Sequence, residues 1–90
     1  MNEKYPVKNP DIVARADQKE ALLFNPADGN MLCVNGTGIL IWDLCDGTRV
    51  KGDIIKKITG DYDVTAKRAT EDYDSFMKEM EEVGFIGYRT

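Results

Sequence analysis

The 90-residue sequence contains no histidine, and its two cysteines, Cys33 and Cys45, form no CxxC pair. Histidine is the commonest general base and the commonest metal ligand, and a zinc site would need two further ligands of a kind that the chain mostly lacks. No nucleophile–base pair and no phosphate-binding loop is visible either. We therefore expect a protein that is not an enzyme, with no catalytic residue, no bound metal and no cofactor.

Long apolar runs and an excess of positive charge are also missing. The most apolar stretch, residues 35–47, is far shorter than the about 20 residues of a membrane span, and residues 1–6 lack the apolar segment of a signal peptide. These features predict a cytoplasmic protein with no membrane partner. There thiols stay reduced, so we expect Cys33 and Cys45 to be small, buried core residues. The net charge of −4 disfavours a nucleic-acid partner, because phosphate binding requires Lys and Arg.

The stretch from Asn35 to Gly47 predicts a short helix buried at the centre of the fold. Asn35 or Thr37 can accept a hydrogen bond from the first-turn amides, and Gly47 can take the left-handed conformation that ends a helix. Between Thr37 and the closing Asp46-Gly47 only Asp43 is charged. Apolar side chains therefore face nearly every direction around the helix axis, as in helices that are buried on all sides, and we expect Trp42 to belong to the core.

The segments on either side of this helix predict a single α+β domain. Residues 12–15, 21–25 and 31–34 are short apolar runs, and residues 26–30 separate the last two with the Pro and Asp-Gly signals of a hairpin turn. Residues 50–58 and 65–83 each place apolar side chains on one helical face. The predicted fold is winged helix-turn-helix-like: a three-stranded antiparallel sheet followed by three helices. Residues 1–10 are expected to be an irregular lead-in to a domain spanning residues 11–90.

The order of these elements, together with the central motif Asn-x-Thr-Gly-x-x-Ile-Trp-x-Leu-x-Asp-Gly and a closing Gly-Phe-Ile, resembles the PqqD family. The resemblance extends over roughly residues 12–86. Gly36 stands where members tied to pyrroloquinoline quinone usually carry Glu, which favours a relative that serves another peptide pathway. The residues that carry the resemblance are Asn35, Thr37, Gly38, Ile41, Trp42, Leu44, Asp46, Gly47, Gly84, Phe85 and Ile86.

Members of that family are small non-enzymatic domains, also called RiPP precursor peptide recognition elements. They bind the leader of a ribosomally made precursor peptide and present it to a modifying enzyme, often a radical SAM protein. The resemblance implies the same partners here, with the leader added as a further strand to the third predicted strand, beside the last helix. The implied site residues are Asn30, Met31, Leu32, Cys33 and Val34 from the strand and Arg68, Ala69, Asp72, Tyr73 and Phe76 from the helix.

Three alternatives remain open on the residues alone. The spacing of Tyr73, Phe76 and their apolar neighbours is also that of an ordinary core stripe. A winged-helix domain could bind DNA through its lysines and Arg68, which the acidic total disfavours. The third strand could instead pair with its own copy in a scaffold or dimerisation module, so the chain is expected to be a monomer or a weak homodimer.

Overall fold

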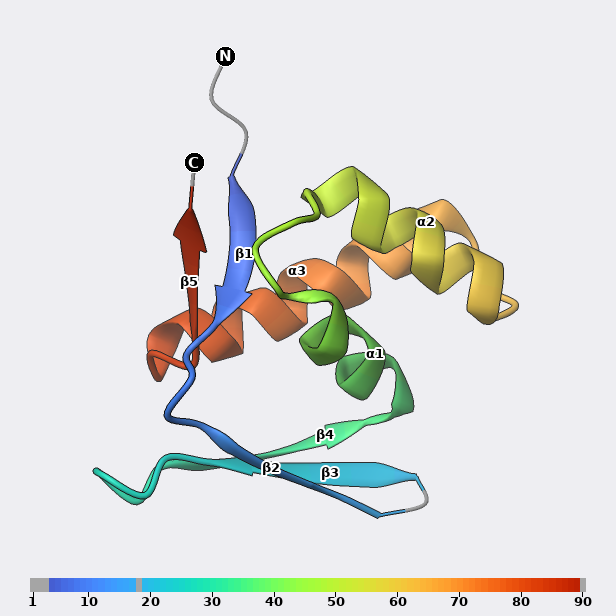
Figure 1. The fold of residues 1–90 in the computed structure, drawn as a ribbon. Helices are drawn as coiled ribbons and strands as arrows, with labels where there is room; N and C mark the ends of the chain where they lie inside the picture. Colours follow the sequence, from blue (N-terminus) through green and yellow to red (C-terminus); the bar gives the residue numbers. More distant parts are fainter. Residues whose placement is uncertain (1–3, 18, 90) are drawn as a thin grey trace.

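A computed structural model describes residues 4–17 and 19–89 of the chain. Strands β2 (Val13–Ala16), β3 (Glu20–Phe24) and β4 (Met31–Asn35) form an antiparallel sheet in that order. Helix α1 (Gly36–Leu44) lies between this sheet and the helices α2 (Lys51–Asp61) and α3 (Ala66–Glu82), as Figure 1 shows. The predicted α+β fold, with its three-stranded sheet and three helices, is confirmed. No helix of the described ranges is long and apolar enough to cross a membrane.

The sheet is buried on one face only. Ala21 and Leu23 of β3 and Val34 of β4 are buried, whereas the alternate residues Leu22 and Cys33 are exposed. Successive side chains of a strand point to opposite faces, so the inner face packs on α1 and the outer face meets solvent. The prediction of a buried Cys33 is therefore wrong: the residue falls on the outward-facing register of β4.

The central helix forms as the sequence predicts. Asn35 is the N-cap, and its Oδ1 accepts a hydrogen bond from the Gly38 N–H at 3.0 Å. Ile41 is fully buried and Trp42 is 5% exposed, at the centre of a core shared by the sheet and all three helices. The helix ends at Leu44, and Gly47 follows with φ +82°, a conformation that favours glycine.

Helix α3 is the longest element and is amphipathic. Its N-cap is Thr65, whose Oγ1 accepts a hydrogen bond from the Arg68 N–H at 3.2 Å. Gly84, with φ +76°, follows the helix end. Helix α2 runs through Gly60 to Asp61, beyond its predicted end. The buried residues of α3 are Ala69, Tyr73, Phe76, Met77 and Met80.

The N-terminal segment contains a strand, contrary to the irregular lead-in predicted for residues 1–10. Strand β1 (Tyr5–Lys8) pairs antiparallel with β5 (Ile86–Arg89), the segment that follows α3. The Lys8 N–H also donates to the Cys45 carbonyl (2.9 Å), and the Gly47 N–H donates to the Pro6 carbonyl (3.0 Å). These partners lie far away in the sequence, so local signals could not reveal the strand. Residues 1–3 of the predicted lead-in lie outside the described residues.

Candidate functional site

Strand β4 is bonded to β3 along one side. In antiparallel strands, pairs that exchange backbone hydrogen bonds alternate with pairs that do not. The bond from the Asn25 N–H to the Asn30 carbonyl (2.9 Å) is the first of the hairpin. With the observed register, the next bonded residues of β4 are Leu32 and Val34. Their N–H and C=O groups therefore point toward β3.

The opposite side of β4 is a free edge of the sheet. The alternation directs the backbone N–H and C=O groups of Met31 and Cys33 away from β3, and no further strand pairs with β4 in the described part of the chain. Such an edge is a template for pairing with another extended segment. Met31 is also 63% exposed, so its side chain does not cover the edge.

A cleft of about 260 Å³ lies between this edge and α3. Its apolar floor comes from β4, α1 and α3 and includes Val34, Ile41 and Phe76. Gly38 lets this floor pack closely. A Cβ at position 38 would lie 3.0 Å from the Val34 Cβ and 3.3 Å from the Phe76 ring, so a larger residue would require these side chains to shift. The glycine of the central motif thus shapes the cleft.

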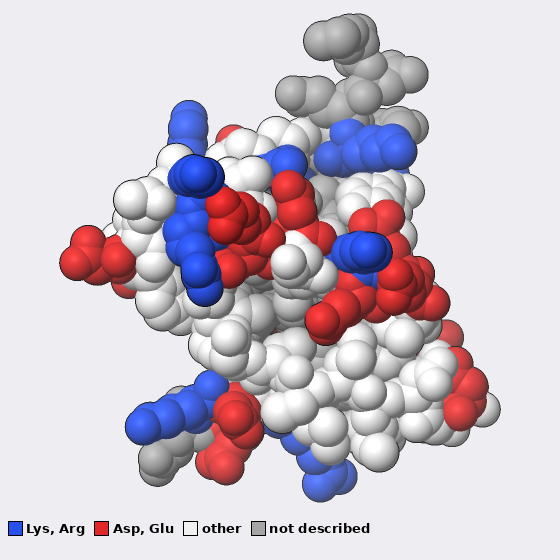
Figure 2. All heavy atoms as spheres, turned by 180° about the vertical axis from the view of Figure 1, so that it is seen from behind, with Lys and Arg blue, Asp and Glu red and all other residues white. Residues whose placement is uncertain are grey.

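The wall of the cleft is one polar flank of α3. Arg68, Asp72, Ser75 and Glu79 all line the cleft, and their spacing of three or four residues places them on one side of the helix. The Arg68 Nε lies 3.3 Å from the Asp72 Oδ1 in an ion pair. Figure 2 shows charged side chains of both signs crowding the helical half of this side of the molecule, while the sheet half is largely uncharged. The cleft therefore has one apolar surface and one charged surface.

The structure brings together half of the residues that the sequence singled out for this site. Met31 and Leu32 belong to β4 but do not line the cleft, and Asn30 is an exposed residue just before the strand. Ala69 is fully buried in the core, and Tyr73 lines a different hollow. The predicted residues that do line the cleft are Cys33, Val34, Arg68, Asp72 and Phe76.

Sequence reasoning missed the other lining residues. Ser75 and Glu79 continue the spacing of Arg68 and Asp72 along the helix, and following that spacing by one further turn would have found them. The floor residues from the start of α1 could not be found this way, because only the chain reversal after β4 places them there. The missed lining residues are Asn35, Thr37, Gly38, Ile41, Ser75 and Glu79.

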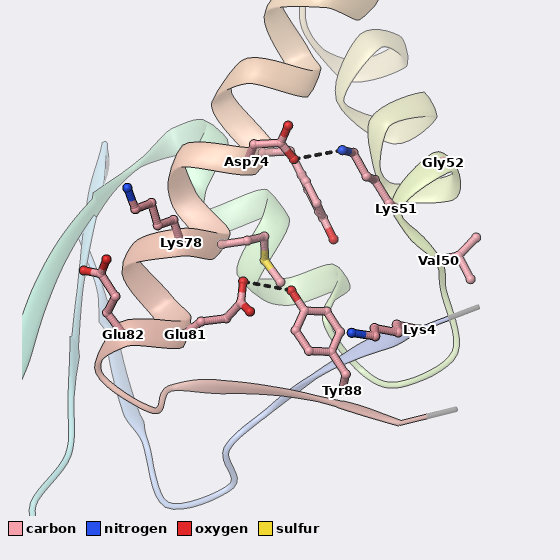
Figure 3. A pocket seen from close by; sticks show the side chains of 11 residues that line it. Lys4, Val50, Lys51, Gly52, Asp74, Lys78, Glu81, Glu82 and Tyr88 are labelled. Carbon is pink, nitrogen blue, oxygen red and sulfur yellow. Dashed lines mark hydrogen bonds and ion pairs between the residues drawn. The ribbon is translucent and has the colours of Figure 1, made fainter. Parts of the chain in front are cut away.

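A second, larger hollow of about 600 Å³ lies on the other flank of α3, between the start of α2 and the β1–β5 pair. Figure 3 shows its rim, where Lys51 Nζ meets the Asp74 carboxylate at 2.9 Å and the Tyr88 hydroxyl donates to Glu81 at 3.1 Å. The Lys4 Nζ lies 5.7 Å from the centre of the Tyr88 ring. Two polar pairs of this hollow thus satisfy each other, whereas Lys78 and Glu82, which also line it, make no ion pair among the described residues.

The two tyrosines that line this hollow have raised pKa values. Burial raises the pKa of Tyr73 to about 12. Burial and the hydrogen bond to Glu81 raise the pKa of Tyr88 as well. Burial also raises the pKa of the Cys45 thiol to about 12, so this thiol is not a nucleophile at neutral pH. Among the described residues no group of His, Cys, Asp and Glu could hold a metal ion.

Comparison with known proteins gives one family and two related structures. The sequence model of the family described as coenzyme PQQ synthesis protein D (PqqD) matches residues 20–86. The structure of TbiB1 in complex with the TbiA(beta) leader peptide matches with a TM-score of 0.77 and 19% identity, covering 93% of this chain and 99% of that chain. A lasso peptide synthetase B1 complexed with the leader peptide matches equally well, with coverages of 92% and 98%. At this identity the two structures establish the fold alone. No curated protein matches the sequence.

Proposed function

Because the chain belongs to the PqqD family, we propose that it is a peptide-recognition module without catalytic activity. It binds the leader segment of a ribosomally made precursor peptide and presents that peptide to a modifying enzyme, such as a radical SAM protein. The leader adds to β4 as a further strand and lies in the cleft beside α3. The two solved structures of the same fold, each of which carries a leader peptide, support this proposal.

The observation that carries the proposal is the free edge of β4, which opens onto a cleft with an apolar floor. The unpaired N–H and C=O groups of Met31 and Cys33 supply main-chain hydrogen bonds to any extended segment, and the cleft supplies contacts to alternate side chains. A catalytic site needs groups whose pKa is adjusted toward the reaction. The raised pKa values here belong instead to buried, neutral groups.

The same edge could pair with a second copy of the chain, but DNA binding is disfavoured. Arg68 is held in an ion pair with Asp72, and Lys51 in one with Asp74. Acidic side chains lie directly beside the basic ones over the helical surface, as Figure 2 shows, so the cations there have acidic neighbours that oppose phosphate binding. A mobility-shift assay at low salt should show no retardation of DNA.

Amide NMR titration with the leader of any precursor peptide encoded beside the gene of this protein tests the proposal. We expect the shifts to concentrate in β4 and along residues 68–79 of α3. The decisive variant is Cys33→Pro, because proline removes the N–H that points to the free edge and leaves the bonds between β3 and β4 in place. We expect Cys33→Pro to fold and to lose peptide binding.

Two further variants control this experiment. Cys33→Ala keeps the backbone N–H and should bind the peptide as the unchanged protein does. Leu32→Pro removes a donor that points toward β3, so it should destabilise the sheet itself. Unchanged binding by a folded Cys33→Pro variant would show that the peptide does not add to β4.

A further inference from the structure

Glu79 carries the uncompensated charge of the cleft. Arg68 and Asp72, the other charged residues that line it, neutralise each other at 3.3 Å. Within the described residues Glu79 makes no ion pair. Its neighbours one turn away on the helix, at positions 75, 76, 82 and 83, include no cation.

The facing side of the cleft offers Glu79 no counter-charge either. The residues contributed by β4 and the start of α1 are all uncharged. A cation that pairs with Glu79 must therefore come from the ligand. Partial shielding by the ligand strengthens such a pair, because less water remains to screen the two charges.

The register of an added strand determines which of its side chains can reach Glu79. Residues of an added strand that lie opposite Leu32 and Val34 point to the inner face of the sheet, toward α3, whereas those opposite Met31 and Cys33 point outward. Only every second residue of the ligand can therefore reach Glu79. Since β4 and α3 run in opposite directions (Figure 1), Glu79 lies toward the beginning of β4 and Arg68 toward its end.

The spacing along the ligand follows from helix and strand geometry. Glu79 lies eleven residues after Arg68, which is about 16 Å along the helix axis at about 1.5 Å per residue. An extended segment spans this length in about five residues at 3.4 Å each. Because inward positions recur every second residue, the side chains that face Arg68 and Glu79 are about four or six residues apart.

We propose that Glu79 is a specificity-determining residue of the cleft and selects a Lys or Arg on the inward face of the bound segment. This inference rests on the proposed function, since it requires a strand bound at β4. An added strand that is antiparallel to β4 carries the basic residue near the C-terminal end of its bound part. A strand that is parallel to β4 carries it near the N-terminal end.

Selection from a random library of 15-residue peptides by mRNA display tests this specificity without knowledge of the natural ligand. The selection is run in parallel on the unchanged protein, Glu79→Lys and Glu71→Lys. Peptides that also bind Cys33→Pro are discarded, because they bind elsewhere than at the β4 edge. Glu71 is exposed on the same helix and lines neither hollow, so its substitution controls for the change in net charge. We expect Lys or Arg enrichment at one inward position with the unchanged protein and with Glu71→Lys, and Asp or Glu at that position with Glu79→Lys.

Affinity measurements on one selected peptide complete the test. Replacing its basic residue by Glu should weaken binding about fivefold, the size expected of a partly exposed ion pair, and Glu79→Lys should restore the affinity. Equal enrichment for the unchanged protein and Glu79→Lys, or no rescue by the charge exchange, overturns the role of Glu79 and leaves strand addition intact. If the library yields no peptide whose binding depends on the β4 edge, the proposed function fails instead.

Discussion

The two flanks of α3 differ in what they leave unpaired. On the flank beside β4, backbone groups of a sheet edge and the carboxylate of Glu79 have no partner among the described residues. On the flank beside α2 and β5, Lys51 pairs with Asp74, and Tyr88 with Glu81. More polar side chains are thus paired with one another on the flank with the larger hollow. An open sheet edge is a better guide to a peptide ligand than volume, because its unpaired N–H and C=O groups can bond to an added strand.

The largest effect should come from breaking the floor of the cleft. Phe76 is 9% exposed and packs against Gly38 and Val34. We expect Phe76→Ala to lower the free energy of unfolding by about 3–5 kcal/mol, because a cavity replaces the ring. Urea denaturation followed by circular dichroism measures this change. A loss below about 1 kcal/mol would mean that the floor is not closely packed.

Replacing one glycine on each flank by alanine should sharpen the comparison, since we expect the two substitutions to change the free energy of unfolding in opposite directions. Gly38→Ala forces a Cβ to within 3.0 Å of Val34, and we expect it to destabilise the fold by about 1–3 kcal/mol. Gly52 lies at the start of α2 beside the second hollow, and a Cβ added to it would meet no atom within 4 Å. Gly52→Ala should therefore stabilise the protein, by up to about 1 kcal/mol. Urea midpoints measure both changes in stability. If both substitutions changed the stability in the same direction, the packing around Gly38 and Gly52 would be contradicted.

High pH should destabilise the protein through the buried thiol of Cys45. Cys45 keeps its proton in the folded state up to a pKa of about 12, but loses it near pH 9.0 when unfolded. The unfolded chain then binds fewer protons, so stability is fully present below pH 9 and falls as pH rises from 9 toward 12. The raised pKa values of Tyr73 and Tyr88 act in the same direction.

Urea midpoints between pH 8 and pH 11 measure this dependence. Cys45→Ala should fall less steeply with pH than the unchanged protein, by at most about 1.4 kcal/mol per pH unit. The slopes are compared rather than the absolute stabilities, because the substitution also removes buried sulfur. Identical slopes would exclude the thiol as a contributor.

The smallest effect should come from the rim of the second hollow. Lys51 and Asp74 form an ion pair at 2.9 Å, but their side chains are 50% and 57% exposed. We expect Asp74→Ala to change stability by less than about 1 kcal/mol, and by less still in high salt. Peptide binding at β4 should be unaffected. A marked loss of binding in this variant would show that the two flanks do not act independently.

Local chemistry was sufficient for most of the fold. The cap at Asn35, the turn at Gly29 and the apolar spacing of α3 act over a few residues, so they can be read directly. The pairing of β1 with β5 joins the two ends of the chain and has no local signature. The exposure of Cys33 was missed because a run of four apolar residues does not indicate which alternate side chains face solvent.

The site was predictable as an edge and a helix, but not as a cleft. The sequence indicated β4 and the charged turn at Arg68 and Asp72, yet it could not separate the two flanks of α3. A rotation of about 100° per residue moves Tyr73 to the opposite flank from Asp72, although the two are adjacent in the chain. Which flank meets β4 depends on how α3 is rotated about its axis, and the packing of its apolar face against α1, α2 and β5 determines that rotation.

By itself, the sequence determined the helices, the turns and the order of strands β2, β3 and β4, because capping, glycine conformation and apolar periodicity are short-range effects. Only the tertiary structure decided that β1 pairs with β5, that Gly38 leaves room for Phe76, and that Glu79 faces a cleft without a counter-charge. These properties depend on contacts between segments far apart in the chain. Such contacts arise when the apolar faces of the sheet and the helices are buried together in one core.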